Sequence, residues 1–144
     1  MQGLIQRVKH ASVVVANETV GEIGPGILLL LGVEKQDGQA QADKLLHKVI
    51  NYRIFPDEKD HMNLSLLDTG GDLLVVSQFT LAADTQKGLR PSFSSAAEPA
   101  LAEDIYDAFV RVASEQVTVA TGRFGADMAV SLLNDGPVTF LLKT

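Results

Sequence analysis

The residues best suited to chemistry follow an apolar run: Ser77, Gln78 and Thr80 come directly after Leu73–Val76, in the stretch SQFTL. The end of a buried strand is where α/β sheets present ligand-binding groups. A serine or threonine hydroxyl there could attack as a nucleophile, but each needs a base, and the sequence offers no obvious one. Backbone N–H groups of the loop could instead stabilise an oxyanion. Hydroxyls that merely cap the strand end fit these residue types equally well.

Other kinds of catalytic site are poorly represented. The chain has no cysteine, which excludes disulfides, zinc-thiolate sites and cysteine nucleophiles. His10, His47 and His61 each lack a second histidine or a carboxylate at the spacing of a metal site. No G-x-S-x-G elbow, Walker loop or G-x-G-x-x-G motif follows a strand. We therefore expect no metal ion and no cofactor.

A second unusual stretch is NDGPVTFLL, Asn134–Leu142, where a turn signal runs straight into an apolar segment. Asparagine and glycine tolerate positive φ, and proline is allowed as the first residue of a strand. Residue types alone predict a hairpin corner between strands over Ala129–Leu133 and Val138–Leu142. This final hairpin is apolar on more than one face, so it could form a subunit interface.

Length and composition predict one cytoplasmic domain over residues 1–144, enough to bury roughly two-thirds of the unfolded chain's surface. The amino-terminal residues lack the apolar core of a signal peptide, and the longest apolar run, Ile27–Leu31, is too short to cross a membrane. The net charge of −6 argues against a general nucleic-acid coat. Residues 1–53 hold six basic residues against five acids, whereas the remainder holds six against thirteen, so one basic face is still possible.

Two helices and several strands must position these groups. The predicted strands lie at Leu4–His10, Val13–Ala16, Val20–Ile23, Ile27–Val33, Tyr52–Phe55, Leu73–Val76, Val117–Thr121, Ala129–Leu133 and Val138–Leu142. Helical spacing appears after Asp37-Gly38, at Ala42, Leu45, Leu46, Val49 and Ile50, and again from about Pro99, at Leu101, Ile105, Phe109 and Val112. A long polar loop, Ala82–Ala97, precedes the second helix. This order predicts an α/β fold with a mixed, mostly antiparallel sheet and two main helices.

Seven short motifs, each weak alone, together match one family in order and spacing. They are IQRV at Ile5–Val8, ASV at Ala11–Val13, MNLS at Met62–Ser65, SQFTL, KGLRPSF from Lys87, TGRFGADM at Thr121–Met128, and NDGPVT. On these motifs the chain resembles the D-aminoacyl-tRNA deacylases along nearly its whole length. The resemblance implies a homodimer that hydrolyses the ester joining a D-amino acid, or glycine, to the 3′ terminal adenosine of tRNA.

The resemblance also implies an active site at the dimer interface. In the family, SQFTL of one subunit meets the Gly-Pro of the other, whose peptide is cis and whose carbonyl oxygens point into the partner's pocket. Gly136 and Pro137 would then select chirality by leaving no room for the side chain of an L-amino acid. Glycine, which has no side chain, would not be rejected.

For the reaction, the matching positions imply that Ser77–Thr80 surround the scissile carbonyl, with the N–H groups of Phe79 and Thr80 as oxyanion donors. The 2′-hydroxyl of the RNA would help to activate water. An older view of the family makes Thr80 a nucleophile, which we rank second because no base is evident.

Supporting roles follow from the same resemblance. Arg7 would brace the Gly-Pro corner by hydrogen bonding to carbonyls, and Met128 would line the pocket, although core packing explains a methionine equally well. Lys87 and Arg90 are candidates for tRNA contacts. Asp60-His61 departs from the glycine and lysine of many relatives, which leaves a phosphate contact there in doubt.

Two further hypotheses remain open. The pocket could belong to a catalytically silent module that binds D-amino acids or tRNA ends. It could also belong to an amidase or esterase for D-amino acid derivatives that lack RNA.

Overall fold

The protein is built on one six-stranded mixed sheet, and the computed structural model describes all 144 residues. The strand order is β2-β1-β3-β6-β7, and β8 pairs with the remaining edge of β1. β1 is antiparallel to β2, β3 and β8, whereas β3, β6 and β7 run parallel to one another. The strands are β1 (Gln2–Val15), β2 (Glu18–Ile23), β3 (Gly26–Gly32), β6 (Asp72–Ser77), β7 (Val119–Thr121) and β8 (Ala129–Lys143). The predicted mixed, mostly antiparallel sheet is confirmed.

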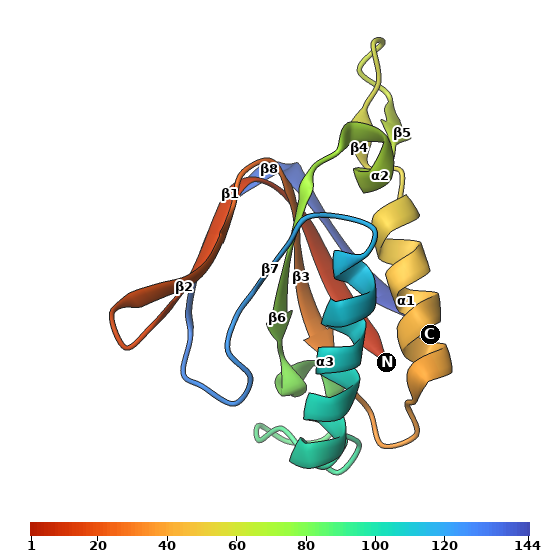
Figure 1. Cartoon of the computed structure of the whole chain (residues 1–144). Coiled ribbons are helices and arrows are strands. Elements are labelled where there is room, and N and C mark those ends of the chain that lie inside the picture. Colours follow the sequence, from red (N-terminus) through yellow and green to blue (C-terminus); the bar gives the residue numbers. More distant parts are fainter.

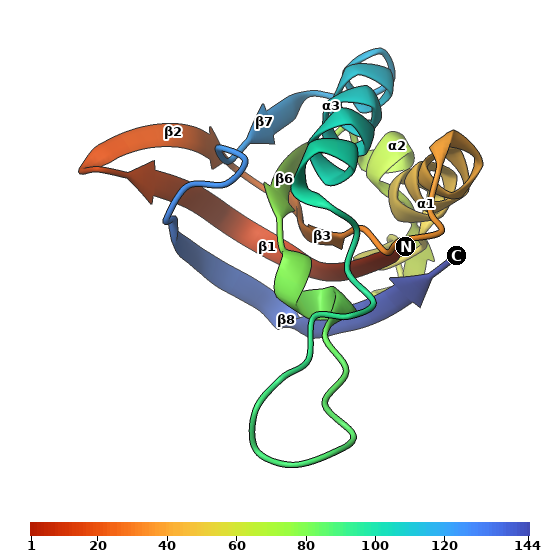
Figure 2. The same cartoon turned by 90° about the horizontal axis from the view of Figure 1, so that it is seen from below.

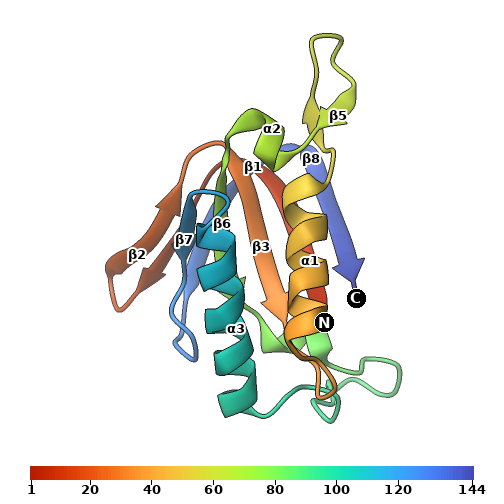
Figure 3. The same ribbon diagram turned by 45° about the vertical axis from the view of Figure 1, so that its right-hand side comes forward.

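The two predicted helices both cover the same face of the sheet (Figures 1 and 3). α1 (Gln39–Asn51) buries the five apolar residues whose spacing predicted it. α3 (Pro99–Ser114) begins with proline in its first turn, where the missing N–H costs no helical bond. None of the helices is long and apolar enough to cross a membrane.

Short elements fill the connections. A small hairpin of β4 (Phe55–Pro56) and β5 (Met62–Leu64) projects beyond the sheet (Figure 1). The single helical turn α2 (Leu66–Thr69) is capped by Ser65, which accepts from the N–H of Asp68. The 3₁₀ helix η1 (Phe79–Ala82) follows β6 directly. Its residues begin the long connection to α3.

Apolar residues lie on both faces of the sheet, because the sheet bends. A cluster of 23 buried residues fills the space between the sheet and the helices. A second cluster of eight, including Val13, Leu28 and Val76, lies among residues of β1, β2, β3 and β6. The carboxyl half of β1 curves away with β2 and β8 (Figure 2). Gly21 of β2 approaches β7 so closely that an added Cβ would lie 2.2 Å from the carbonyl oxygen of Thr121.

The carboxyl-terminal hairpin predicted from Asn134-Asp135-Gly136 is wrong. β8 is one strand that pairs with β1 on both sides of these residues, because Val8 lies opposite Asn134 and Gln6 opposite Thr139. The turn residues form a bulge. Similarly, the two strands predicted within residues 4–16 are one strand, β1, which exchanges β3 for β2 as its neighbour.

The amino-terminal residue is buried, and its ammonium group is held by two carboxylates. Met1 is 1% exposed, and its ammonium group donates to Glu34 Oε2 at 2.9 Å and to Asp37 Oδ1 at 2.6 Å. The hydrogen bond from this ammonium group is the main cause that lowers the pKa of Glu34. Thus, the turn after β3 is held by charge, in contrast to the apolar packing around it.

Candidate active site

The SQFTL stretch lies at the carboxyl end of β6, as its position after an apolar strand predicted. The N–H of Gln78 donates to the carbonyl of Leu31 at 2.8 Å, which joins the end of β6 to β3. η1 then turns the chain away from the sheet. The first N–H groups of a 3₁₀ helix have no partner within the helix, and here they belong to Phe79 and Thr80.

A cavity of about 480 Å³ opens beside this strand end. Ser77, Gln78 and Phe79 form part of its wall, and Met128 lies on the wall as well. The remaining lining is mainly apolar and comes from β3 and β6, from α3 and the residue before it, and from the chain around the start of β8. These residues are Leu31, Val33, Val76, Ala97, Pro99, Ala102, Tyr106, Phe124, Gly125, Ala126, Asp127 and Val130. Three of the four residues proposed for catalysis therefore share one apolar cavity.

Tyr106 fixes one wall of the cavity and is not among the residues predicted from the sequence. Its hydroxyl donates to the carbonyl of Val75 at 2.9 Å, and its ring lies 5.8 Å from that of Phe124. Burial raises the pKa of Tyr106 to about 12, so the phenol stays neutral near pH 7 and acts as a donor. A signal was present in the sequence, because Tyr106 stands four residues after Ala102 on the buried face of α3.

No general base stands beside Thr80. Its exposed hydroxyl accepts from Nε2 of Gln78 at 2.6 Å, and this is its one side-chain hydrogen bond. Phe79 is 61% exposed, and its ring lies 5.1 Å from that of Phe93 in the following loop. The surroundings of Thr80 therefore offer backbone donors and aromatic surface, and no group that would remove a proton from its hydroxyl.

The Gly136-Pro137 corner lies on the surface of the chain. The peptide between the two residues is cis, as the family resemblance implied, and both residues are exposed. Arg7, only 12% exposed, donates from Nε to the carbonyl of Asp135 at 2.8 Å and from Nη1 to the carbonyl of Ile54 at 2.5 Å. Arg7 therefore contacts one carbonyl beside the corner, that of Asp135, and its bracing of the corner stays a prediction.

Within one chain, the corner and the cavity do not meet. The corner lies opposite Arg7, which pairs with Ile27 of β3, and Ile27 pairs with Leu73 of β6. Ser77 lies four residues further along β6, and β8 is three strand spacings from β6. The two sites are therefore separated by about 13 Å along the strands and about 14 Å across them.

The remaining candidates lie in the loop after η1. Lys87 and Arg90 are fully in solvent, between Asp84 and Ser92, whose backbones form an isolated bridge. Leu89 between them has no burial at all. Both cations therefore lie on the loop that also carries Phe93, whose ring packs on that of Phe79.

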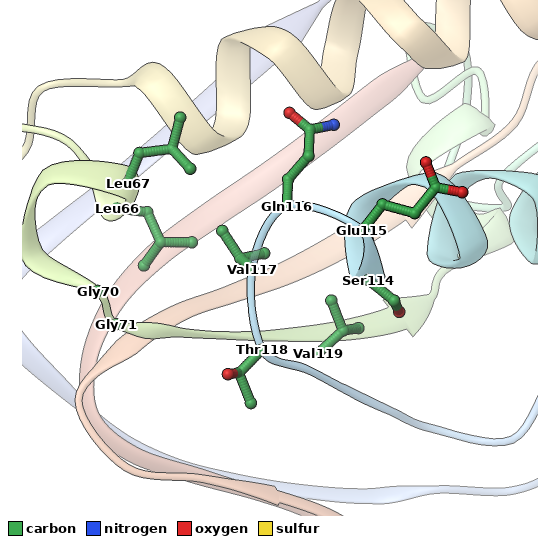
Figure 4. A pocket seen from close by; sticks show the side chains of 10 residues that line it. All are labelled: Leu66, Leu67, Gly70, Gly71, Ser114, Glu115, Gln116, Val117, Thr118 and Val119. Carbon is green, nitrogen blue, oxygen red and sulfur yellow. The ribbon is translucent and has the colours of Figure 1, made fainter.

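Two alternatives to this cavity, a metal site and a second hollow, were compared with the candidate residues. No group of three or more histidine, cysteine, aspartate or glutamate side chains could hold a metal ion. A second hollow of about 530 Å³ lies between α2 and the end of α3 (Figure 4). Its lining contains one charged side chain, Glu115, and none of the candidate residues. The cavity at the end of β6 is therefore the candidate active site.

Known proteins are similar to this chain over nearly its full length. A model of the family described as D-Tyr-tRNA(Tyr) deacylase matches residues 4–143. The D-aminoacyl-tRNA deacylase of Pseudoalteromonas translucida is 69% identical over 143 residues, which are 99% of either chain. That of Stutzerimonas stutzeri is 64% identical and covers 100% of both chains. The chain belongs to the D-Tyr-tRNA(Tyr) deacylase family.

Solved structures agree on the architecture. A protein named "c-Myc DNA Unwinding Element Binding Protein" superimposes with a TM-score of 0.96 at 38% identity, covering 100% of this chain and 99% of its own. A structure described as that of "a probable eukaryotic D-amino acid tRNA deacylase" gives a TM-score of 0.76 at 18% identity, covering 99% and 98%. The second likeness concerns the fold alone.

Proposed function

We propose that the protein hydrolyses the ester of D-aminoacyl-tRNA, releasing the free D-amino acid and tRNA. The observation that carries this proposal is the cavity at the end of β6, which has aromatic and apolar walls and lies next to the N–H groups at the start of η1. Asp127 is the one charged side chain in its wall, and no histidine or lysine lines it. Membership of the deacylase family supports the same activity.

The terminal adenosine of tRNA is the group that we place in the cavity. Phe79, Tyr106 and Phe124 supply aromatic surface on which the adenine ring can stack. The cavity volume of about 480 Å³ is in the range of small-ligand pockets. The ester then lies at the rim, next to Ser77–Thr80. Because this substrate is charged tRNA, we also propose that the protein works in the cytoplasm.

Hydrolysis requires that water add to the ester carbonyl carbon, so that negative charge develops on the carbonyl oxygen. The N–H groups of Phe79 and Thr80 are available to stabilise that charge, and one such donor is typically worth about 10²–10³ in rate. The bond to the ribose oxygen then breaks, and this oxygen leaves as a hydroxyl with a proton that comes from the attacking water. With no basic side chain at hand, the neighbouring 2′-hydroxyl of the ribose is our candidate for activating water.

Selection of the D-amino acid requires a second copy of the chain. The corner at Gly136-Pro137 is too far from its own cavity to act there, so we propose a homodimer in which it enters the partner's site. Exposed apolar residues of β8, namely Leu133, Phe140 and Leu141, support an interface on this strand. Main-chain atoms of the corner then occupy the space that an L side chain needs, whereas glycine is accepted.

A direct assay separates this proposal from its alternatives. The protein is incubated with D-tyrosyl-tRNA, L-tyrosyl-tRNA and D-tyrosine methyl ester, and the released amino acid is measured. Release from D-tyrosyl-tRNA alone supports the proposal. Release from none of the three indicates a binding module, and release from the methyl ester without a preference for tRNA indicates a general esterase.

A further inference from the structure

The side chain of Asn134 joins the two sides of the Gly136-Pro137 corner. Its Oδ1 accepts from the N–H of Val138 at 2.7 Å, which fixes the orientation of the amide because only the oxygen can accept. Its Nδ2 donates to Oγ1 of Thr139 at 2.9 Å and to the carbonyl of Val138 at 3.4 Å. One side chain therefore contacts three atoms on the far side of the bulge.

The hydrogen bonds of Asn134 span a part of β8 that has no strand pairing with β1. β1 pairs with Asn134 through Val8 and with Thr139 through Gln6, and the residues between them have no register partner. Arg7 holds the near end of the bulge at the carbonyl of Asp135. Val138, 4% exposed, anchors the far end in the core. Asn134 ties that anchor to the start of the corner.

We propose that Asn134 is a positioning residue for chirality selection: it sets the direction in which the Gly136-Pro137 carbonyls enter the partner's site. This inference rests on the function proposed above. The chemistry favours asparagine at this position, because one planar group must accept from an N–H and donate to two oxygens. Aspartate at position 134 can still accept from the N–H of Val138 but cannot donate to the two oxygens. Leucine has a similar size and shape but can form none of these hydrogen bonds.

The test is the ratio of kcat/KM for D-tyrosyl-tRNA to that for L-tyrosyl-tRNA. Asn134→Leu should lower this ratio at least about tenfold, and Asn134→Asp and Thr139→Val should each lower it a few-fold, as expected for the loss of part of the hydrogen bonding. Hydrolysis of glycyl-tRNA should change little in all three, since glycine presents no side chain to the corner. Asn51→Leu, on the surface of α1, is the matched control and should leave the ratio unchanged.

A merely structural role would give a different pattern. Loss of folded enzyme lowers the rates on D-, L- and glycyl-tRNA in parallel and leaves the ratio intact, which would overturn the inference. If Asn134→Leu does not fold, as judged by its melting curve, Thr139→Val and Asn134→Asp decide by the same ratio. Failure of the proposed function is separate, because the wild-type protein would then show no preference for the D-substrate.

Discussion

The cavity at the end of β6 and the corner on β8 are built in different ways. The cavity is enclosed by apolar and aromatic side chains of one chain, and its wall is fixed by the buried bond from Tyr106 to Val75. The corner is exposed and is held by polar side chains, Arg7 and Asn134. In the proposed function, the cavity binds the substrate and assists hydrolysis within one chain, whereas discrimination depends on a corner that acts in the partner's site.

The largest effect should come from removing a backbone donor of the cavity. Phe79→Pro deletes one N–H at the first position of η1. Proline is tolerated in the first turn of a helix, and Gln78 before it lies outside the α region that a following proline disfavours, with φ −141° and ψ 77°. We expect kcat for D-tyrosyl-tRNA to fall by about 10²–10³, the usual cost of one oxyanion donor.

Matched variants separate the donor from the side chains. Phe79→Ala removes the ring and keeps the N–H, and Thr80→Ala removes the hydroxyl and keeps its N–H. Both should retain far more activity than Phe79→Pro in single-turnover assays. If Thr80→Ala were as inactive as Phe79→Pro, the hydroxyl would be the nucleophile and the backbone account would be wrong.

A smaller but selective effect is expected at the corner. An added Cβ at Gly136 would lie 2.5 Å from Cγ2 and 2.7 Å from the backbone nitrogen of Val138, so the corner of Gly136→Ala must shift. We expect the rate on D-tyrosyl-tRNA to fall about tenfold or more, since a misplacement of about 1 Å at a reacting site can cost up to about 10² in rate. Binding of free adenosine to the cavity, measured by calorimetry, should stay unchanged. If Gly136→Ala lowered the affinity for adenosine as much as it lowered the rate, the cavity and the corner would not be independent.

Removing a cation of the long loop should lower activity less than damaging the cavity or the corner. Lys87→Ala and Arg90→Ala each remove one charge that we assign to tRNA phosphate. Each should raise KM a few-fold at low salt and reduce the slope of log KM against log salt by about 0.7–0.9. A methyl-ester substrate without RNA should be unaffected. Unchanged slopes in both variants would place the tRNA elsewhere.

The smallest effect concerns acid stability near the cavity. Val33 and Ala97 line the cavity and are joined by a backbone bond of 3.1 Å next to Glu34. The pKa of Glu34 is lowered from 4.5 by its bond to the ammonium of Met1, so its contribution to folding is present above about pH 4.5 and is lost as pH falls further.

Melting curves check this point. The melting temperature of the wild type should fall more steeply below pH 4.5 than that of Glu34→Gln, which has no carboxyl to protonate at this position. Identical pH profiles for the two proteins would show that the ion pair contributes nothing to folding.

The sequence predicted the helices and the cavity strand well, because both depend on local patterns. The spacing of Ala42, Leu45 and Val49 is visible along the chain, and so is the apolar run before Ser77. Leu101 was placed on the buried face of α3 but is 42% exposed, and Tyr106 was overlooked although its ring is buried. At the amino end of a helix, the apolar stripe alone does not show which side meets the sheet.

The corner was harder to predict because its surroundings are distant in sequence. Asn134-Asp135-Gly136 has the residue types of a hairpin turn, and these types cannot tell a turn from a bulge. The choice depends on β1, whose residues 2–14 pair with both halves of β8. Similarly, nothing in a single sequence says which chain the corner will face, since that is a property of the assembled pair.

The most direct test of the central claim is complementation between two impaired variants. Phe79→Pro damages the cavity and Gly136→Ala damages the corner, and the two chains are coexpressed so that mixed dimers form. If each site combines one chain's cavity with the other's corner, every mixed dimer has one intact site, and activity on D-tyrosyl-tRNA should return to about a quarter of the wild-type rate. Activity that stays at the level of the separate variants would contradict the shared site.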